Sequence, residues 1–476
     1  MKNETAAGKR KPNILLIMTD QHRFDCLGCH GHPLVKTPHI DRLAAAGVDF
    51  QRCYAQSAIC MPSRLTALTG QYLHTHGIQH NSRQVDVSHL TTLPQVLKQQ
   101  GYQTAAVGKT HVGRSDEVGF DYARICAGAV VGETNQYNQY LADLGLSEPD
   151  RDQAMKAYDA YVSAIPYEHT NEVWTANQAL EFLNQRNAEQ PFMLWLTFER
   201  PHAPTCVPPD NPFPYDPEAI TLPPYDERFY TKPDTRRPGC ENSWNVFNTG
   251  EKVLRQALAN YYSLISMIDD QIGRVLGHLE ETGALENTVV IFTADHGDFA
   301  GAYGQFGKNT STFDVLYRVP FIWSWPGRTG RERSYELVEL TDFMPTVLEL
   351  AGIDCPASVQ GRSIAPAILG SPTRGGLPWD GKDAVFFETP YVKTVRTKTH
   401  KLSLGHKGGR RSWGQLYDLA RDPWELENLF DRPEHQWVQQ RLERRLLEWF
   451  IETDQPQEAG AGWNETPPEW CEGAAR

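Results

Sequence analysis

The sequence lacks a long hydrophobic run and lacks an excess of positive charge. No stretch approaches the roughly 18 consecutive apolar residues of a membrane-spanning helix. The formal net charge is −13 at pH 7, which argues against non-specific attraction to nucleic acid or to anionic membranes. We therefore expect neither nucleic acid nor a membrane as a partner. An acidic protein can still contain a locally basic pocket, so an anionic substrate stays open.

Closely spaced cysteine pairs are also scarce. Cys26 and Cys29 form a single C-x-x-C, a spacing used in zinc sites and redox sites, but no second pair matches it. Dispersed cysteines of a cytosolic chain are most often reduced and structural, and we interpret this pair in the same way. The nine cysteines stand at positions 26, 29, 53, 60, 126, 206, 240, 355 and 471.

The first residues lack the features of a secretory leader. Residues 1–11 are polar and basic, and the first apolar run, residues 14–18, is much shorter than the roughly 7–15 apolar residues of a signal peptide. We therefore expect a cytoplasmic protein, unless a leader has been removed.

A chain of 476 residues is too long for one ordinary core, so we expect a large domain and a smaller one. Apolar runs alternate with amphipathic segments, which predicts an α/β fold with a large, mostly parallel sheet between helices. The expected strands lie near residues 13–18, 102–107, 192–198 and 289–293, and the expected helices near residues 38–46, 92–100, 171–185 and 251–282.

The pattern changes near residue 380. Short strand-like segments at residues 385–388, 394–396 and 401–404 are followed by residues 416–418 and by an amphipathic segment at residues 437–450. We predict a catalytic domain at residues 1–378. We predict a smaller domain at residues 379–476, made of an antiparallel sheet and one helix, that contributes to the rim of the pocket.

Four polar residues follow predicted strands directly: Asp20, Lys109, His202 and Asp295. In mostly parallel sheets, ligands bind beyond the carboxyl ends of the strands. The shared placement of these four residues therefore predicts a single site.

Cys60 stands just before a predicted helix. Pro62 suits the first helical turn, because its missing N–H needs no partner there. A helix N-terminus favours anions, and Arg64 returns to the same face of the helix, where it can support negative charge.

The run C-M-P-S-R at residues 60–64, followed by L-T-G at residues 68–70, resembles the signature of the formylglycine-dependent type I sulfatases of the alkaline-phosphatase-like superfamily. In that family a maturation enzyme oxidises the cysteine to formylglycine. Further matches occur in family order over nearly the whole chain, at residues 12–20, 108–111 (G-K-T-H), 201–204 (P-H-A-P), 293–297, 307–308 and 416–423.

The resemblance implies an alkaline-phosphatase-like fold and a divalent cation, with Ca²⁺ favoured and Mg²⁺ or Mn²⁺ as alternatives. Gln21 departs from the commoner pattern, in which a second Asp stands at this position, and its amide oxygen would coordinate the cation without adding a charge. The implied metal ligands are Asp20, Gln21, Cys60 as formylglycine, Asp295 and His296.

The resemblance also implies a mechanism. One hydroxyl of the hydrated aldehyde attacks sulfur, His202 or Lys308 protonates the leaving alcohol, and His111 deprotonates the second hydroxyl so that sulfate is expelled. The implied catalytic residues are Cys60, Arg64, Lys109, His111, His202 and Lys308.

We therefore expect a sulfuric ester hydrolase that acts on a sulfated carbohydrate, an aryl sulfate or an alkyl sulfate. The alternative enzyme is a phosphonate monoester or phosphodiester hydrolase, whose family combines Asp-Gln with Asp-His. The Lys109 and His111 of the G-K-T-H element favour sulfate. A third reading is a non-catalytic protein that binds a sulfated ligand. The sequence does not determine the natural substrate or the oligomeric state.

Some features stay ambiguous. His74, His76, His80 and Asn81 fit either a pocket rim or a solvated turn. Residues 126–170 and 201–238 are candidates for substrate selection. A basic stretch at residues 407–411, followed by Trp413, fits either a solvated face or a loop that grips an anionic sugar.

Overall fold

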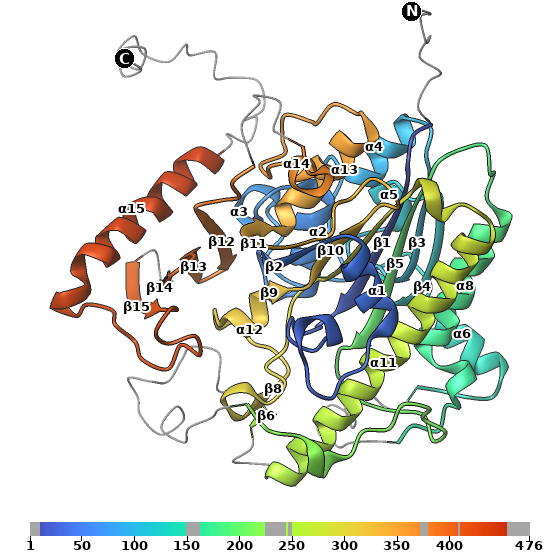
Figure 1. Cartoon of the computed structure of the whole chain (residues 1–476), viewed down its shortest axis with the longest axis horizontal. Coiled ribbons are helices and arrows are strands. Elements are labelled where there is room, and N and C mark those ends of the chain that lie inside the picture. Colours follow the sequence, from blue (N-terminus) through green and yellow to red (C-terminus); the bar gives the residue numbers. More distant parts are fainter. Residues whose placement is uncertain are drawn as a thin grey trace, which may run out of the picture.

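The computed structural model describes residues 10–148, 162–223, 244–245, 250–371, 379–407 and 410–454. Most of these residues form a large sheet covered by helices, with a smaller sheet and a long helix beside it (Figure 1).

The large sheet is mostly parallel, as predicted. Its strands run in the order β11-β2-β10-β7-β1-β5-β3-β4, with the short β9 paired to β2. Only β10 and β9 run antiparallel to their neighbours. The strands are β1 (Asn13–Asp20), β2 (Val48–Tyr54), β3 (Gln103–Lys109), β4 (Tyr122–Ala127), β5 (Phe192–Pro201), β7 (Thr288–Ala294), β9 (Arg318–Val319), β10 (Phe321–Ser324) and β11 (Glu332–Glu339).

Helices cover both faces of this sheet because the side chains of each central strand alternate between two cores. In β1, Leu16 and Met18 belong to one apolar cluster, and Leu15 and Ile17 belong to another. The first cluster includes residues of α2 (Cys60–Thr69), α4 (Leu93–Gln99), α13 (Phe343–Ala351) and α14 (Ala365–Leu369). The second includes residues of α1 (Pro38–Ala46), α8 (Asn171–Gln185) and α11 (Glu251–Glu281).

Shorter elements connect these parts. The short helices are α3 (Leu73–His76), α5 (Ser115–Val118), α6 (Gln136–Asp143) and α12 (Asp314–Tyr317), and β6 (Trp244–Asn245) pairs with β8 (Gln305–Phe306). Single 3₁₀ turns lie at Gly28–His30, Tyr167–His169, Pro217–Ala219, Leu285–Asn287, Ala302–Gly304, Leu340–Asp342 and Pro433–His435.

The C-terminal part is an antiparallel sheet with one helix, which confirms the predicted composition. Its strands are β12 (Ala384–Thr389), β13 (Val392–Thr397), β14 (His400–Lys407) and β15 (Arg410–Asp418), and its helix is α15 (Gln436–Thr453). Trp449 of α15 stacks on Phe386 of β12. The backbone N–H of Phe386 donates to Glu339 at the end of β11 at 2.7 Å, which joins the two sheets. The boundary between residues 378 and 379 stays a prediction.

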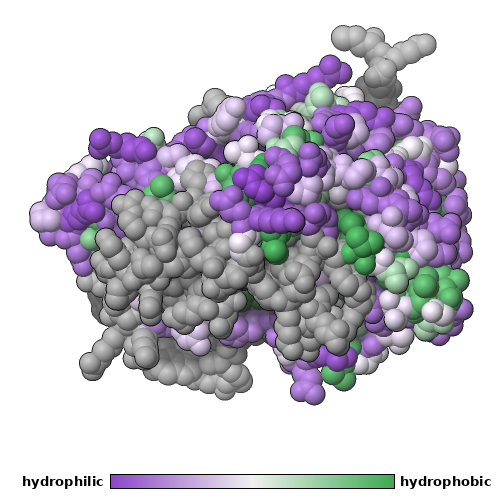
Figure 2. Space-filling model, turned by 90° about the horizontal axis from the view of Figure 1, so that it is seen from below, coloured by the Kyte–Doolittle hydropathy of each residue, from purple (hydrophilic) through white to green (hydrophobic). Residues whose placement is uncertain are grey.

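No helix among the described residues combines the length and apolar character needed to cross a membrane. The coloured atoms of the face in Figure 2 are mainly hydrophilic, with small scattered hydrophobic patches.

Candidate active site

The ends of four parallel strands bring the predicted residues to one edge of the sheet. Asp20 ends β1 and Lys109 ends β3, while His202 and Asp295 directly follow β5 and β7. Neighbouring parallel strands end at the same edge, so these side chains meet although they are far apart in the sequence. The predicted placement of all four residues is confirmed.

Cys60 is the first residue of α2. Ile59 before it is extended, and the backbone N–H of Met61 donates to Asn81 Oδ1 at 3.0 Å. The side chain of Cys60 is 1% exposed, and the whole helix is buried. The residue therefore lies at a buried helix N-terminus, where the helix dipole favours negative charge.

Positively charged groups surround the Cys60 sulfur. Lys308 Nζ lies 2.8 Å from Sγ and Lys109 Nζ lies 3.9 Å from it, and His296 Nε2 is 3.4 Å away. Burial alone would raise the pKa of this thiol, but the two lysines and His296 hold the pKa well below its usual range. The site therefore stabilises negative charge on the side chain at position 60.

Arg64 joins two carboxylates beneath Cys60. Its Nε donates to Asp295 at 2.8 Å and its Nη2 donates to Asp20 at 3.3 Å. Its Nη1 donates to Thr197 Oγ1 at 2.8 Å, and the whole side chain is buried. The hydrogen bonds of Arg64 position these two carboxylates. The charge of Cys60 also raises the pKa of Arg64, which agrees with the predicted support of negative charge at residue 60.

A candidate cation site lies beside Cys60. Ligand atoms of Asp20, Cys60, Asp295 and His296 all lie within 4.8 Å of one another, and all four residues are buried. The Nδ1 of His296 is engaged by the carbonyl of Gly297 at 2.9 Å, which leaves Nε2 directed toward the cluster. Two carboxylates and an imidazole fit a divalent cation.

Gln21 adds a possible fifth ligand. Its backbone has a positive φ of 64°, and its buried Oε1 accepts no hydrogen bond from any described residue. Its Nε2 donates to Asp298, which fixes the orientation of the amide. A buried carbonyl oxygen without a donor is costly unless a cation or a water satisfies it. The residues present therefore fit a bound cation, and Gln21 fits as a neutral ligand.

His111 and His202 complete the surroundings of Cys60. A hydrogen bond from His111 helps to lower the pKa of the thiol, and His111 Nδ1 is buried without a partner among the described residues. His202 Nδ1 is engaged by the carbonyl of Ala203 at 2.6 Å. Burial and the Lys109 charge lower the pKa of His202. The structure thus brings every predicted site residue into one cluster.

The comparisons with known proteins decide the family. The family model described as sulfatase matches residues 12–353, and the model described as N-sulphoglucosamine sulphohydrolase, C-terminal, matches residues 301–452. The chain belongs to the sulfatase family. An arylsulfatase of Clostridium perfringens is 31% identical to this sulfatase over 462 residues, which cover 89% of this chain and 91% of the relative.

Two further similar proteins carry names that give different activities. An N-acetylglucosamine-6-O-sulfatase of Bacteroides thetaiotaomicron is 27% identical over 504 residues, covering 92% of this chain and 86% of the relative. The solved phosphonate monoester hydrolase of Agrobacterium radiobacter has a TM-score of 0.79 at 23% identity, covering 93% of this chain and 96% of that one. This structural likeness confirms the alkaline-phosphatase-like fold and no more.

Two residues of this sulfatase site were not predicted from the sequence. Thr197 accepts a hydrogen bond from Arg64, and Asp298 accepts one from Gln21. Burial raises the pKa of Asp298 to about 6. The only sequence feature that could have predicted Asp298 is its position three residues after Asp295. No sequence feature marks Thr197, because it lies inside an apolar strand.

Two of the ambiguous histidines are engaged within the fold. His74 contacts Glu388 and Thr453 of the C-terminal part, and His76 is buried beside Thr66. Both readings of His76 were therefore wrong. His80 is exposed and Asn81 binds the start of α2, next to residue 60.

The other ambiguous segments are only partly described. Residues 149–161, 224–238 and 408–409 lie outside the described residues, as do the side chains at 407 and 410–412. Trp413 is half-buried, and its indole packs against Gly405 on the neighbouring strand. This contact favours a structural role for Trp413.

Cys26 and Cys29 are free thiols, buried and half-buried respectively. Cys29 lies in a group with His30 and Asp49 whose ligand atoms are within 4.8 Å of one another. Both ring nitrogens of His30 are already engaged, by the carbonyl of Phe24 and by Asp49. This group therefore offers no free imidazole nitrogen to a metal.

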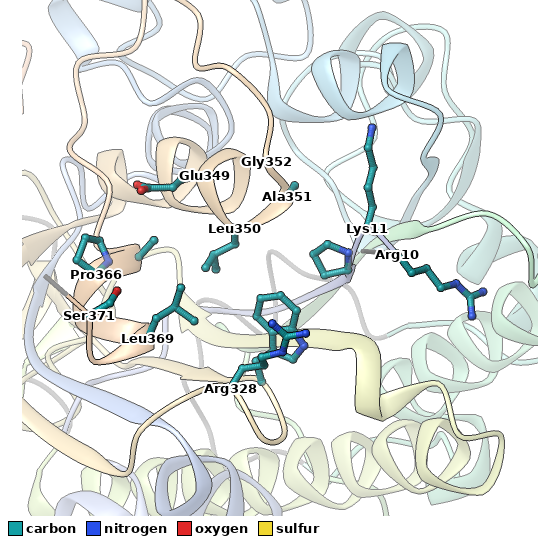
Figure 3. A pocket seen from close by; sticks show the side chains of 13 residues that line it. Arg10, Lys11, Arg328, Glu349, Leu350, Ala351, Gly352, Pro366, Leu369 and Ser371 are labelled. Carbon is teal, nitrogen blue, oxygen red and sulfur yellow. The ribbon is translucent and has the colours of Figure 1, made fainter. Parts of the chain in front are cut away.

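A groove of about 530 Å³ lies at the amino end of β1, at the opposite edge of the sheet from Asp20 (Figure 3). Arg328 lies over the ring of Trp325 on its floor, and Lys11 and Glu349 lie along its sides. It shares no residue with the Cys60 cluster and takes no part in the site.

Proposed function

We propose that this sulfatase releases inorganic sulfate from a sulfated carbohydrate, using a formylglycine formed from Cys60 and a bound divalent cation, with Ca²⁺ favoured. The N-acetylglucosamine-6-O-sulfatase among its relatives supports a sugar substrate. The observation that carries the proposal is the convergence of Lys109, Lys308 and the acidic cluster on residue 60 at the N-terminus of α2.

Asp20, Gln21, Asp295 and His296 would hold the cation beside residue 60. The bound cation would supply Lewis acidity, which lowers the pKa of a hydroxyl on residue 60. The hydrated aldehyde would supply one hydroxyl for attack on sulfur and a second whose deprotonation expels sulfate, an elimination that a thiol cannot perform.

Lys109 and Lys308 direct their charges at the reacting group. Negative charge builds on the bridging oxygen as the S–O bond breaks, so ammonium groups placed there stabilise the transition state more than the ground state. Lys109 also pairs with Asp20, which holds its ammonium in place beside Cys60.

The two histidines move protons. His202 Nδ1 is held by the Ala203 carbonyl, so Nε2 is the atom that delivers a proton to the leaving alcohol, with Lys308 as the other candidate donor. His111 would accept the proton of the second hydroxyl on residue 60, since it acts on this side chain and lowers the pKa of the Cys60 thiol.

A substrate panel tests this proposal. Purified protein with modified residue 60 is given sulfated mono- and oligosaccharides, an aryl sulfate and an aryl phosphonate monoester, and the release of each product is measured. We expect sulfate release, with at least one sulfated sugar turned over faster than the phosphonate. Efficient phosphonate turnover with negligible sulfate release would establish the alternative hydrolase. Binding of sulfated sugars without turnover of any ester would establish the non-catalytic reading.

A further inference from the structure

A second cavity, of about 650 Å³, lies between the two sheets. Its walls come from the loop after β1, from β2, α12, β9 and β11 of the larger part, and from β13 and the segment after β15 of the smaller part (Figure 1). None of its lining residues belongs to the Cys60 cluster. Cavities of this size accommodate small-molecule ligands.

Cations outnumber carboxylates among the residues that line this cavity. Two pairs neutralise each other, because Arg23 binds Asp25 at 2.6 Å and Arg396 binds Asp314 at 3.3 Å. The cations are Arg23, Arg52, Arg318, Arg396 and Lys398, and the carboxylates are Asp25 and Asp314. Lys398 pairs with Glu336 outside the cavity. Arg52 and Arg318 form no direct ion pair with a carboxylate among the described residues, although the charges of Asp314 and Asp25 act on Arg318 and oppose the effect of burial on its pKa.

These two guanidinium groups have unused donors. Arg318 donates through Nε to the carbonyl of Gln51 at 2.8 Å and lies 3.7 Å from the ring centroid of Phe24, so both Nη groups stay free. Burial lowers the pKa of Arg318. Arg52 is half-buried and makes no hydrogen bond or ion pair with the described residues. Guanidinium groups in this state favour an oxyanion, which they bind through paired N–H donors.

Aromatic side chains border the same cavity. Trp424 lines it, and Tyr335 is 55% exposed at its edge, while the ring of Phe24 is already covered by His30 and by the Arg318 guanidinium. Aromatic faces stack on the apolar faces of sugar rings, while neighbouring arginines bind the charged substituents of those rings. The combination fits an anionic sugar better than a free inorganic ion, which would leave the aromatic faces unused.

We propose that this cavity binds a sulfated or carboxylated sugar through Arg52 and Arg318, at a site separate from residue 60. The proposal extends the proposed function. Arg23 connects the two sites, since its Nη1 donates to the carbonyls of Phe299 and Ala300, in the loop that follows Asp298. The ligand is either another unit of the substrate chain or a separately bound saccharide.

The binding stoichiometry of a sulfated disaccharide tests the proposal. Calorimetry is carried out on the full chain carrying Cys60→Ala, with and without Arg52→Gln. Arg328→Gln is the matched control, because Arg328 lines the groove at the other edge of the sheet. We expect Arg52→Gln to weaken one class of sites about tenfold, the effect of one charge-assisted hydrogen-bonding group, while the other class keeps its affinity. Arg328→Gln should bind as the parent does.

Unchanged stoichiometry and affinity in Arg52→Gln would overturn the proposal. Inorganic sulfate that fills the cavity as tightly as the disaccharide would overturn the assignment to a sugar. If residue 60 carries no substrate site, the parent shows a single class of sites and Arg52→Gln weakens that class, so a failure of the proposed function is distinguishable. The last comparison uses enzyme whose residue 60 has been converted. If Arg52→Gln raises the KM for a sulfated tetrasaccharide but not for an aryl sulfate, the cavity binds another unit of the substrate chain. Unchanged KM values assign it to a separate saccharide.

Discussion

At the scale of single residues, the candidate metal site depends on side chains that do not touch the metal. Asp298 accepts hydrogen bonds from Gln21 Nε2 and from the backbone N–H groups of Ala300 and Gly307. These contacts fix the orientation of the Gln21 amide, whose Oε1 has no hydrogen-bond donor among the described residues. A neutral residue can therefore replace an acid at this position, because its orientation is fixed.

The Asp298→Asn variant tests this role. The new amide places a donor opposite Gln21 Nε2, so the Gln21 amide loses its support and we expect Ca²⁺ affinity to fall about 10- to 100-fold. Calorimetric titration of the metal-free protein measures it. Asp86→Asn, at an exposed turn, should bind as wild type. Equal affinity in Asp298→Asn would show that Gln21 is not a ligand.

Arg64→Gln should expose the repulsion between two buried carboxylates. Its guanidinium bridges Asp20 and Asp295, and removal of one partner from such a buried network costs about 3–5 kcal/mol of stability. A bound cation replaces part of the lost positive charge. Urea unfolding should therefore show a larger loss of stability in chelator than in excess Ca²⁺. Equal losses in both conditions would contradict this account.

The sequence predicted the reactive residues of the site better than the contacts that hold those residues in position. Cys60, Lys109 and Asp295 stand in short segments with a recognisable order, so they could be named from local pattern alone. The contacts of Arg64 and Asp298 arise only when separate strands meet, and no local pattern encodes which oxygen faces which donor.

At the scale of elements, α2 presents residue 60 because its start is fixed by a distant loop. Asn81 Oδ1 accepts the N–H of Met61, one of the N–H groups that a helix leaves without a partner. The helix is otherwise held by burial of all its residues.

Asn81→Ala should lower the free energy of unfolding by about 1 kcal/mol, the usual cost of a lost acceptor at a helix N-terminus. Asn81→Asp keeps an acceptor and should restore most of the loss. Denaturant unfolding of both variants measures the effect. If Asn81→Ala is as stable as wild type, this hydrogen bond does not fix the helix start.

The elements themselves were largely predictable. Helices such as α8 and α11 have regular apolar spacing and strands such as β7 are continuous apolar runs, so their periodicity alone located them to within a few residues. The sequence did not predict the antiparallel β10, because a short buried strand carries no signal of its direction. Nor did it predict that His74 contacts the C-terminal part.

At the scale of the whole molecule, the two parts meet through buried charges. Glu388 of β12 accepts hydrogen bonds from His74 and Lys393. Burial would raise the pKa of Glu388, but these two partners hold it at about 2. Because this folded-state pKa lies below the ordinary value of 4.5, ionised Glu388 stabilises the fold above about pH 4.5, and this contribution is lost as the pH falls toward 2.

Glu388→Gln should therefore be less stable than wild type at neutral pH, and the difference should shrink by up to about 3 kcal/mol as the pH falls below 4.5. Urea unfolding at several pH values measures it. Glu336→Gln removes an exposed partner of Lys398 and should show almost no such dependence. A constant difference between Glu388→Gln and wild type would show that this pair does not contribute to acid stability.

We infer that residue 60 performs the reaction only after its conversion to formylglycine. The most direct test prepares the protein with different fractions of converted Cys60, measured by intact mass, and determines the rate of sulfate release from a sulfated sugar for each preparation. We expect a rate proportional to the converted fraction, with no release from unconverted protein. A rate independent of conversion would contradict it.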